Sequence, residues 1–222
     1  MAKAKYGGGI QDLRGAIAGQ VHSRNTFGNY VRQKVSPVQP RSARQQEIRS
    51  NVAELSQRYS TQLSDTQLEA WRQAAASNTV RDVFGDTMTL TGINLYVKLN
   101  SVRALVNLAP LDDPPAPEEL QTPLANLTWS GTALSVNFSN VSPTQYLAVW
   151  LTKPLPPGRA FVQQELRLLE LIPGTATSPV DITGAYEMRF GTISPGSKIW
   201  LSARTVSPRG WQSQPVVDSE RT

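Results

Sequence analysis

A proline-rich segment in the middle of the chain separates two kinds of hydrophobic pattern. Residues 109–123, APLDDPPAPEELQTP, contain five prolines. Proline fixes φ and lacks a backbone N–H, so the segment favours extended chain over helix interior or central strand. Before this segment, apolar residues recur three and four positions apart, and after it they recur two apart. We therefore expect a helical region and a β region, joined by a linker over residues 110–120.

The helical region is expected over residues 41–109. Ser42 with Gln45, and Ser64 with Gln67, have the spacing of N-terminal capping boxes. The stretch TGINLYVKLNSVRALVNLA predicts a third helix, because its apolar residues share one helical face. Together the three helices predict a small core. Its expected members include Ile48, Leu55, Leu68 and Trp71.

The β region is expected over residues 121–218. Its alternating segments are LTWS, TALSVNFS, TQYLAVWLT, AFVQQELRLLEL, SPVDIT, SKIWLSARTVS and WQSQPVV, separated by Gly, Pro, Ser and Asn. Seven strands in about 100 residues are typical of an immunoglobulin-like sandwich. The ending KIWLSARTVSPRGWQSQP is similar to the last hairpin of a fibronectin type III domain. The expected fold class is α+β multidomain: an extended N-terminal arm, a small three-helix region and a C-terminal all-β immunoglobulin-like sandwich.

Residues 1–40 are expected to form an extended, glycine-rich docking arm. Residues 1–50 carry nine basic and two acidic residues, a net charge of +7, whereas the whole chain carries +5. Apolar and aromatic side chains recur in the arm too regularly for a spacer, which indicates that they fill pockets. Ordering each residue costs about 1–2 kcal/mol, so we expect the arm to fold on a partner. The expected contacts are Tyr6, Ile10, Arg24, Phe27, Tyr30, Arg32 and Lys34.

Two other interpretations of this arm stay open. In the first interpretation the arm is a solvated tail. In the second, its apolar side chains fill pockets on the rest of the same protein.

The sequence offers no set of side chains suited to catalysis or metal binding. There is no cysteine, and His22, in the glycine-rich arm, is the sole histidine. This composition argues against thiolate chemistry, a transition-metal site and a Ser-His-Asp arrangement. The acid pairs Asp112–Asp113 and Glu118–Glu119 flank the linker prolines, where nothing raises their pKa for acid catalysis. We expect a non-enzyme with no metal or cofactor, and no membrane span, since no apolar run reaches about 18 residues.

Three blocks of the sequence resemble a family of structural proteins. The blocks NYVRQKVSPVQPRSARQQEIR, LSDTQLEAWRQAAA and FGDTMTLTGINLYVKLN are similar to proteins encoded in virion structural gene clusters of tailed bacteriophages and prophages, over residues 7–100. One departure is Gln39, where asparagine is expected before Pro40. The matching residues are Arg32, Lys34, Pro37, Pro40, Gln45, Arg49, Leu63, Gln67, Trp71, Ala74, Ala75, Phe84, Gly85, Gly92, Asn94, Leu95, Val97, Leu99 and Asn100.

This resemblance implies a structural component of a tailed-bacteriophage virion, assembled in the host cytoplasm. We expect a capsid auxiliary or cement (decoration) protein whose arm docks on the coat lattice. The expected partner is another virion protein, chiefly the major capsid protein, with self-association left open. Two alternatives are a tail, connector or surface adhesion component, and a virion protein that binds DNA through the arm. DNA is less favoured because glycine and apolar residues dilute the basic ones.

Overall fold

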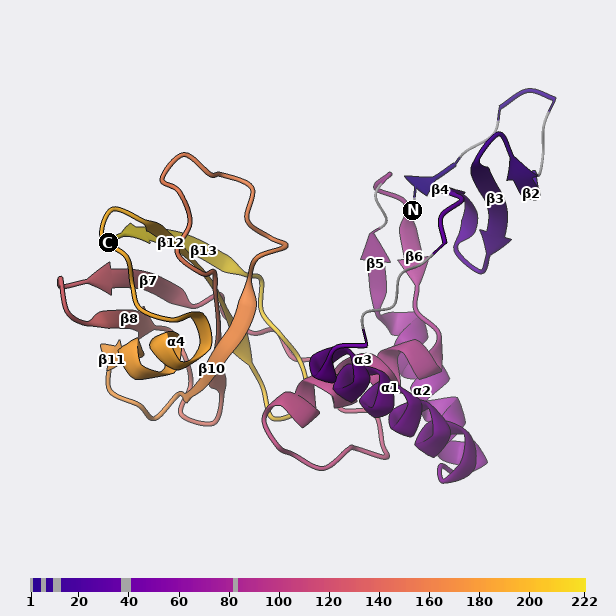
Figure 1. Ribbon diagram of the computed structural model, residues 1–222. Coiled ribbons are helices and arrows are strands. Elements are labelled where there is room, and N and C mark those ends of the chain that lie inside the picture. The colour runs from indigo at the N-terminus through magenta and orange to yellow at the C-terminus, as the bar shows by residue number, and fades with distance from the viewer. Residues whose placement is uncertain (1, 5–6, 10–12, 37–40, 82–83) are drawn as a thin grey trace. The chain divides into compact units, whose positions relative to one another are not determined.

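The computed structural model in Figure 1 describes residues 2–4, 7–9, 13–36, 41–81 and 84–222. The chain divides into two compact units, Met1–Leu95 and Tyr96–Thr222, and the division falls inside helix α3 (Gly92–Leu105). The described residues combine helices with four antiparallel sheets. The described helices include none with the length and hydrophobicity to cross a membrane.

The expected extended N-terminal arm is wrong, because this segment folds into a sheet. Strands β1 (Ala2–Lys3), β2 (Gly15–Ile17), β3 (Gln20–Asn25) and β4 (Gly28–Gln33) form an antiparallel sheet in the order β1-β4-β3-β2. Two tight hairpins connect β2 to β3 and β3 to β4. Of the glycines that suggested a permissive arm, Gly19 lies in the first turn and Gly28 directly follows the second.

The hairpin turns explain why the segment adopts strands. Ala18 and Gly19 have φ angles of 46° and 80°, as a two-residue type I′ turn requires. At the other turn, the Phe27 backbone N–H donates to Asn25 Oδ1 at 2.9 Å, and Gly28 has a φ of 107°. The first turn matches the right-handed twist of paired strands, and the second ends at a glycine with positive φ; the two turns set the register of β2, β3 and β4.

Helices α1 (Ala43–Thr61) and α2 (Asp65–Ser77) begin at side-chain caps. Gln45 N–H donates to Ser42 Oγ at 3.4 Å. Ser64 and Gln67 form a reciprocal capping box, in which the Ser64 N–H donates to Gln67 Oε1 at 3.0 Å. Gly92 begins α3, and an added Cβ there would lie 3.2 Å from the Trp71 carbonyl carbon. The absence of a side chain at this position therefore permits close approach to α2. A hairpin of β5 (Thr79–Arg81) and β6 (Thr87–Thr89) lies between α2 and α3 in sequence.

Two sheets enclose the core of the second unit. Strands β10 (Arg167–Pro173), β9 (Tyr146–Leu151), β12 (Lys198–Val206) and β13 (Val216–Arg221) form one sheet in that order. Strands β11 (Val180–Asp181), β8 (Leu134–Ser139) and β7 (Leu124–Trp129) form the other. Each of the segments with alternating hydrophobicity overlaps one of these strands, although β13 shares only Val216 and Val217 with its segment. Core side chains from both sheets are almost fully buried, and they include Leu127, Val136, Leu147, Val149, Ile199 and Leu201.

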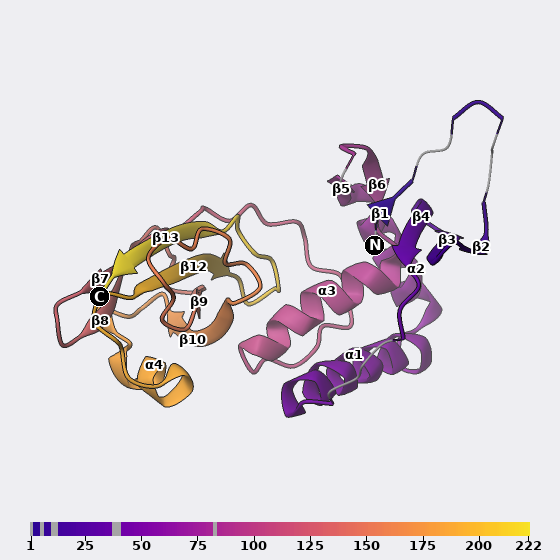
Figure 2. The same ribbon diagram turned by 45° about the horizontal axis from the view of Figure 1, so that its top comes forward.

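The expected all-β immunoglobulin-like sandwich is wrong, because a helix completes this unit. Helix α4 (Thr183–Phe190) follows β11 and lies beside β8 at one side of the sheets (Figure 2). The Leu134 N–H in β8 donates to Thr183 Oγ1 at 2.7 Å, and the Tyr186 hydroxyl donates to the Thr152 carbonyl at 2.9 Å. Helix α4 thus joins the two sheets. The sequence did not predict helix α4, because its eight residues, TGAYEMRF, are too few to show a clear helical period.

The proline-rich segment is bound to its own unit by several hydrogen bonds. Asn100 pairs with Leu111 through both its side-chain oxygen and nitrogen, at 2.7 and 3.3 Å. Arg103 Nε donates to the Ala109 carbonyl at 2.7 Å, and Trp211 Nε1 donates to the Ala116 carbonyl at 3.1 Å. Side chains of α3 and of distant loops therefore position this segment.

Tyr186→Phe is expected to lower the free energy of unfolding by about 1–3 kcal/mol, because the buried Thr152 carbonyl loses its donor. Burial also raises the pKa of the Tyr186 hydroxyl well above its usual value. The folded protein therefore holds this proton more tightly than the unfolded chain, and stability is lost as pH rises above about 10. Urea unfolding near pH 7 and above pH 10 measures both effects. A loss above pH 10 as steep in Tyr186→Phe as in the control Tyr146→Phe would contradict this assignment.

Candidate functional site

The N-terminal sheet gathers several residues that the sequence predicted as contacts. Register pairs Val21 with Arg32 and Ser23 with Tyr30, so these four side chains share one face. Ala16 pairs with Val21 and belongs to the same face. We call this surface the Tyr30 face, and its residues are Ala16, Val21, Ser23, Tyr30 and Arg32.

The remaining predicted contacts lie elsewhere. Arg24 belongs to the opposite face, with His22 and Val31, since neighbouring strand residues alternate. Phe27 lies in the turn between β3 and β4, and the Lys34 backbone N–H, just after β4, donates to the Gly19 carbonyl at 2.7 Å. Tyr6 and Ile10, as well as Pro37 and Pro40 of the resemblance, lie outside the described residues. The sequence therefore identified candidate contact residues, and the strand register shows on which face of the sheet each of them lies.

Both faces of the sheet remain accessible. No residue between 13 and 36 is buried, and Ile17 is 50% exposed. A sheet in water is ordinarily stabilised by burying one apolar face, or by packing on a helix or another sheet. The N-terminal sheet thus presents surface that its own strands do not cover.

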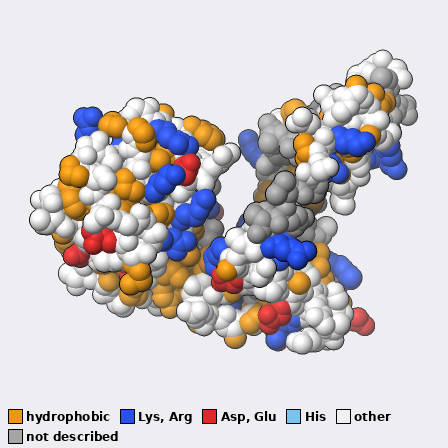
Figure 3. All heavy atoms as spheres, viewed as in Figure 1, with side chains coloured by type: hydrophobic (Ala, Val, Ile, Leu, Met, Phe, Trp, Pro, Cys, Tyr) orange, Lys and Arg blue, Asp and Glu red, His pale blue; other side chains and the backbone are white. Residues whose placement is uncertain are grey.

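The sheet also carries charge of one sign. Residues 13–36 include Arg14, Arg24, Arg32 and Lys34 and no acidic residue. Blue basic and orange hydrophobic side chains lie beside one another on this sheet in Figure 3. A surface of this kind is complementary to an acidic surface that also has apolar pockets.

The expected helical core residues separate into buried and exposed members. Trp71 is fully buried, Leu55 is 4% exposed and Leu68 is half-buried. Ile48 is 51% exposed and lies in the first part of α1, where every residue from 43 to 50 is exposed. Ile48 does lie on the same side of α1 as Leu55, as its helical spacing predicts. The prediction that Ile48 is a core residue is wrong, because the helical period does not show how far along α1 the core extends.

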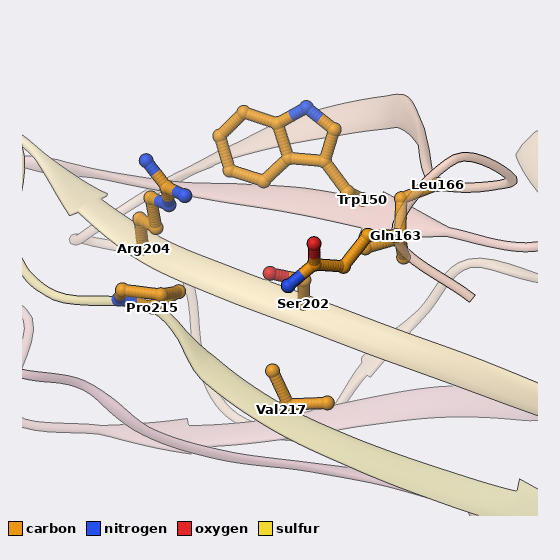
Figure 4. Close-up of a pocket in the computed structure, with 7 residues that line it drawn as sticks. All are labelled: Trp150, Gln163, Leu166, Ser202, Arg204, Pro215 and Val217. Carbon is orange, nitrogen blue, oxygen red and sulfur yellow. The ribbon is translucent and has the colours of Figure 1, made fainter. Parts of the chain in front are cut away.

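A second candidate site lies on the sheet β10-β9-β12-β13, on the face away from the main core. Ser202 of β12 is directly paired with Trp150 of β9 and Val217 of β13. A pocket of about 500 Å³ opens over these residues. We call it the Trp150 pocket (Figure 4), and it is lined by Trp150, Gln163, Leu166, Ser202, Arg204, Pro215 and Val217.

Two polar side chains of the Trp150 pocket, Gln163 and Ser202, lie close together, and Arg204 lies at one end. Figure 4 shows the amide end of Gln163 pointing toward Ser202, with the Trp150 ring above them and Val217 on the other side. The Arg204 guanidinium carbon lies 5.8 Å from the centre of the Trp150 ring. Sequence reasoning missed this pocket, since the strand pattern marked Trp150 and Arg204 only as alternate strand positions.

The described residues show no cluster that suits a metal ion. No three His, Cys, Asp or Glu side chains gather among residues 2–4, 7–9, 13–36, 41–81 and 84–222. Asp181 is the one carboxylate there with a resolved pKa shift: hydrogen bonds from the Thr183 hydroxyl and backbone N–H lower its pKa. These bonds begin helix α4, so their role is structural.

Comparison with known proteins adds little to this picture. No protein-family model matches the chain, and no curated protein matches it. Pectate lyase Pel3 from Pectobacterium carotovorum shares 12% identity over 46% of this chain and 27% of its own, with a TM-score of 0.32. Pectate lyase PelI from Erwinia chrysanthemi shares 13% identity over 44% of this chain and 28% of its own, with a TM-score of 0.30. Similarity this low indicates neither a shared fold nor a shared activity.

Proposed function

We propose that the chain is a non-enzymatic structural protein of a tailed-bacteriophage virion, a capsid auxiliary or cement protein. Its N-terminal sheet docks on the assembled coat through the Tyr30 face. The observation that carries this proposal is a four-stranded sheet with no buried residue between positions 13 and 36. The virion setting comes from the resemblance of residues 7–100 to phage structural proteins.

The free energy of folding favours a sheet whose apolar side chains are covered by a partner protein. Fixing the backbone costs about 1–2 kcal/mol per residue, and folding recovers this mainly by burying apolar surface. The hairpin turns set the shape of the sheet, but its side chains are half-buried or exposed and recover only part of that cost. A neighbouring protein surface that covers Val21 and Tyr30 supplies the missing burial.

The proposed partner is an acidic, pocketed surface of the major capsid protein in the lattice. Tyr and Arg are the residue types that most often dominate protein interfaces, and the Tyr30 face holds one of each. Arg14, Arg24, Arg32 and Lys34 give the sheet as a whole positive charge, and residues 13–36 include no acidic residue. Such charge steers the sheet toward an acidic surface and sets its orientation.

Imaging of purified particles of the encoding phage tests this proposal. We expect the chain in repeated copies on the head lattice, with the Tyr30 face against the coat. We also expect a protease to cut residues 1–36 in the free protein faster than in particles, because docking covers them. Copies found solely on the tail would overturn the capsid assignment. A Tyr30 face left open to solvent in the particle would overturn the docking mode.

A further inference from the structure

The Trp150 pocket has a position that limits how a ligand can bind. Strand β9 lies between β10 and β12, and β12 lies between β9 and β13. Their backbone groups are therefore committed to neighbouring strands on both sides. A peptide cannot add as a further strand at this place, so recognition depends on side chains alone.

The side chains of the pocket match a ring that carries hydroxyl groups. The indole of Trp150 offers a flat apolar surface, which suits the C–H face of a sugar ring. Ser202 and Gln163 each donate and accept hydrogen bonds, as sugar hydroxyls do. Leu166, Pro215 and Val217 add apolar lining on separate sides of the pocket. A mostly apolar cavity with a few convergent polar groups is the usual form of a small-molecule site.

Charge in the pocket favours a ligand with a carboxylate. Arg204 is the one ionisable side chain among the lining residues, and none of them is acidic. Its guanidinium has a weak contact of 3.5 Å with Gln212 Oε1 and no ion pair with any residue of the described ranges. Guanidinium groups bind carboxylates through two parallel hydrogen bonds, and they also stack on aromatic rings.

The loop that closes the pocket is held in place. Gln163 and Leu166 belong to residues 152–166, between β9 and β10, where Val162 is 6% exposed. Glu165 lies between these two lining residues, and its carboxylate contacts Arg159 at 2.9 Å and Lys153 at 3.9 Å. The pocket is thus formed by an anchored loop over a rigid sheet, which reduces the ordering cost of binding.

We propose that the Trp150 pocket binds an acidic saccharide, with the sugar ring on Trp150 and its carboxylate on Arg204. This inference is independent of the docking role of the N-terminal sheet, which lies in the other unit of the chain.

Calorimetric titration of the full chain tests the proposal. The probes are the methyl glycosides of glucuronate, mannuronate and N-acetylneuraminate, and each is compared with its uncharged methyl ester. We expect saturable binding of at least one acid, with its ester about tenfold weaker because the charge-assisted hydrogen bonds are lost. Trp150→Ala should abolish binding, and Arg204→Gln should reduce the acid to the affinity of its ester.

Lys198→Gln is the matched control for the charge change. Lys198 lies on the same strand and face as Arg204, with its Nζ 4.3 Å from the Trp200 ring centre, but it does not line the pocket. Binding should be unchanged in this variant, and circular dichroism of all variants checks that they fold. Absence of binding by all three acids overturns the proposal, as does equal weakening by Lys198→Gln. Competition by sodium acetate at equal concentration would indicate a general anion site and would also overturn it.

Discussion

Replacing Trp71 with alanine is expected to lower the free energy of unfolding of the helical region by about 3–5 kcal/mol. Trp71 is fully buried in α2, and its backbone lies close to Gly92 at the start of α3. Its removal leaves a cavity that the surrounding helices cannot easily fill. Domain stability is only about 5–15 kcal/mol in total, so this single change removes a large fraction of it.

Urea unfolding followed by helical circular dichroism measures this effect. Gln73→Ala, an exposed position on the same helix, is the control and should change stability by less than about 0.5 kcal/mol. If Trp71→Ala proves too unstable to purify, Trp71→Phe should give a smaller loss in the same direction. Equal stability of Trp71→Ala and Gln73→Ala would show that Trp71 is not a core residue of this region.

Truncating Tyr30 is expected to weaken docking far more than neutralising Arg32, although both residues share one face of the sheet. Tyr30→Ala should cost about 2 kcal/mol or more, roughly a thirtyfold loss of affinity, if the ring is buried in a partner pocket. Arg32→Gln or Lys34→Gln should each cost about 0–1 kcal/mol, and that effect should fade with salt. Phe27→Ala, at the turn, should rank with Tyr30→Ala.

Binding of these variants to particles that lack the protein, at two ionic strengths, provides the comparison. Val31→Ala is the control for the opposite face and should bind as the unmodified chain does. A larger loss for Val31→Ala than for Tyr30→Ala would show that the other face docks. A DNA-binding sheet predicts the reverse ranking, because contacts with phosphate fall steeply in strength with salt. That outcome would replace the docking proposal with the nucleic-acid alternative.

The helix starts were accessible to sequence reasoning because they depend on neighbours. Ser64 and Gln67 are three residues apart, and their reciprocal hydrogen bonds form within one turn of chain. The alternating segments after residue 123 likewise each overlap a strand, because a half-buried strand imposes its own period of two. Burial of Leu55 and Trp71 also follows from their helical period.

The N-terminal sheet was only partly within reach of sequence reasoning. Ala18–Gly19 and Phe27–Gly28 are turn signals, but the segments that flank them, VHSRN and NYVRQ, do not alternate between apolar and polar residues. With no strand period beside it, the abundance of glycine suggested an extended arm. The identity of Tyr30 and Arg32 as contact residues came from the sequence, but only pairing with Ser23 and Val21 puts them on one face.

By itself the sequence determined the starts of α1 and α2, the charge of the N-terminal segment and the lack of cysteine chemistry, since each depends on residue type or on near neighbours. Only the tertiary structure decided that Ile48 is exposed, that α4 joins two sheets, and that Trp150, Gln163 and Arg204 line one pocket. The physical reason is distance along the chain. Strand pairing brings β9 beside β12 across a long intervening segment, and no local pattern records which strands will pair.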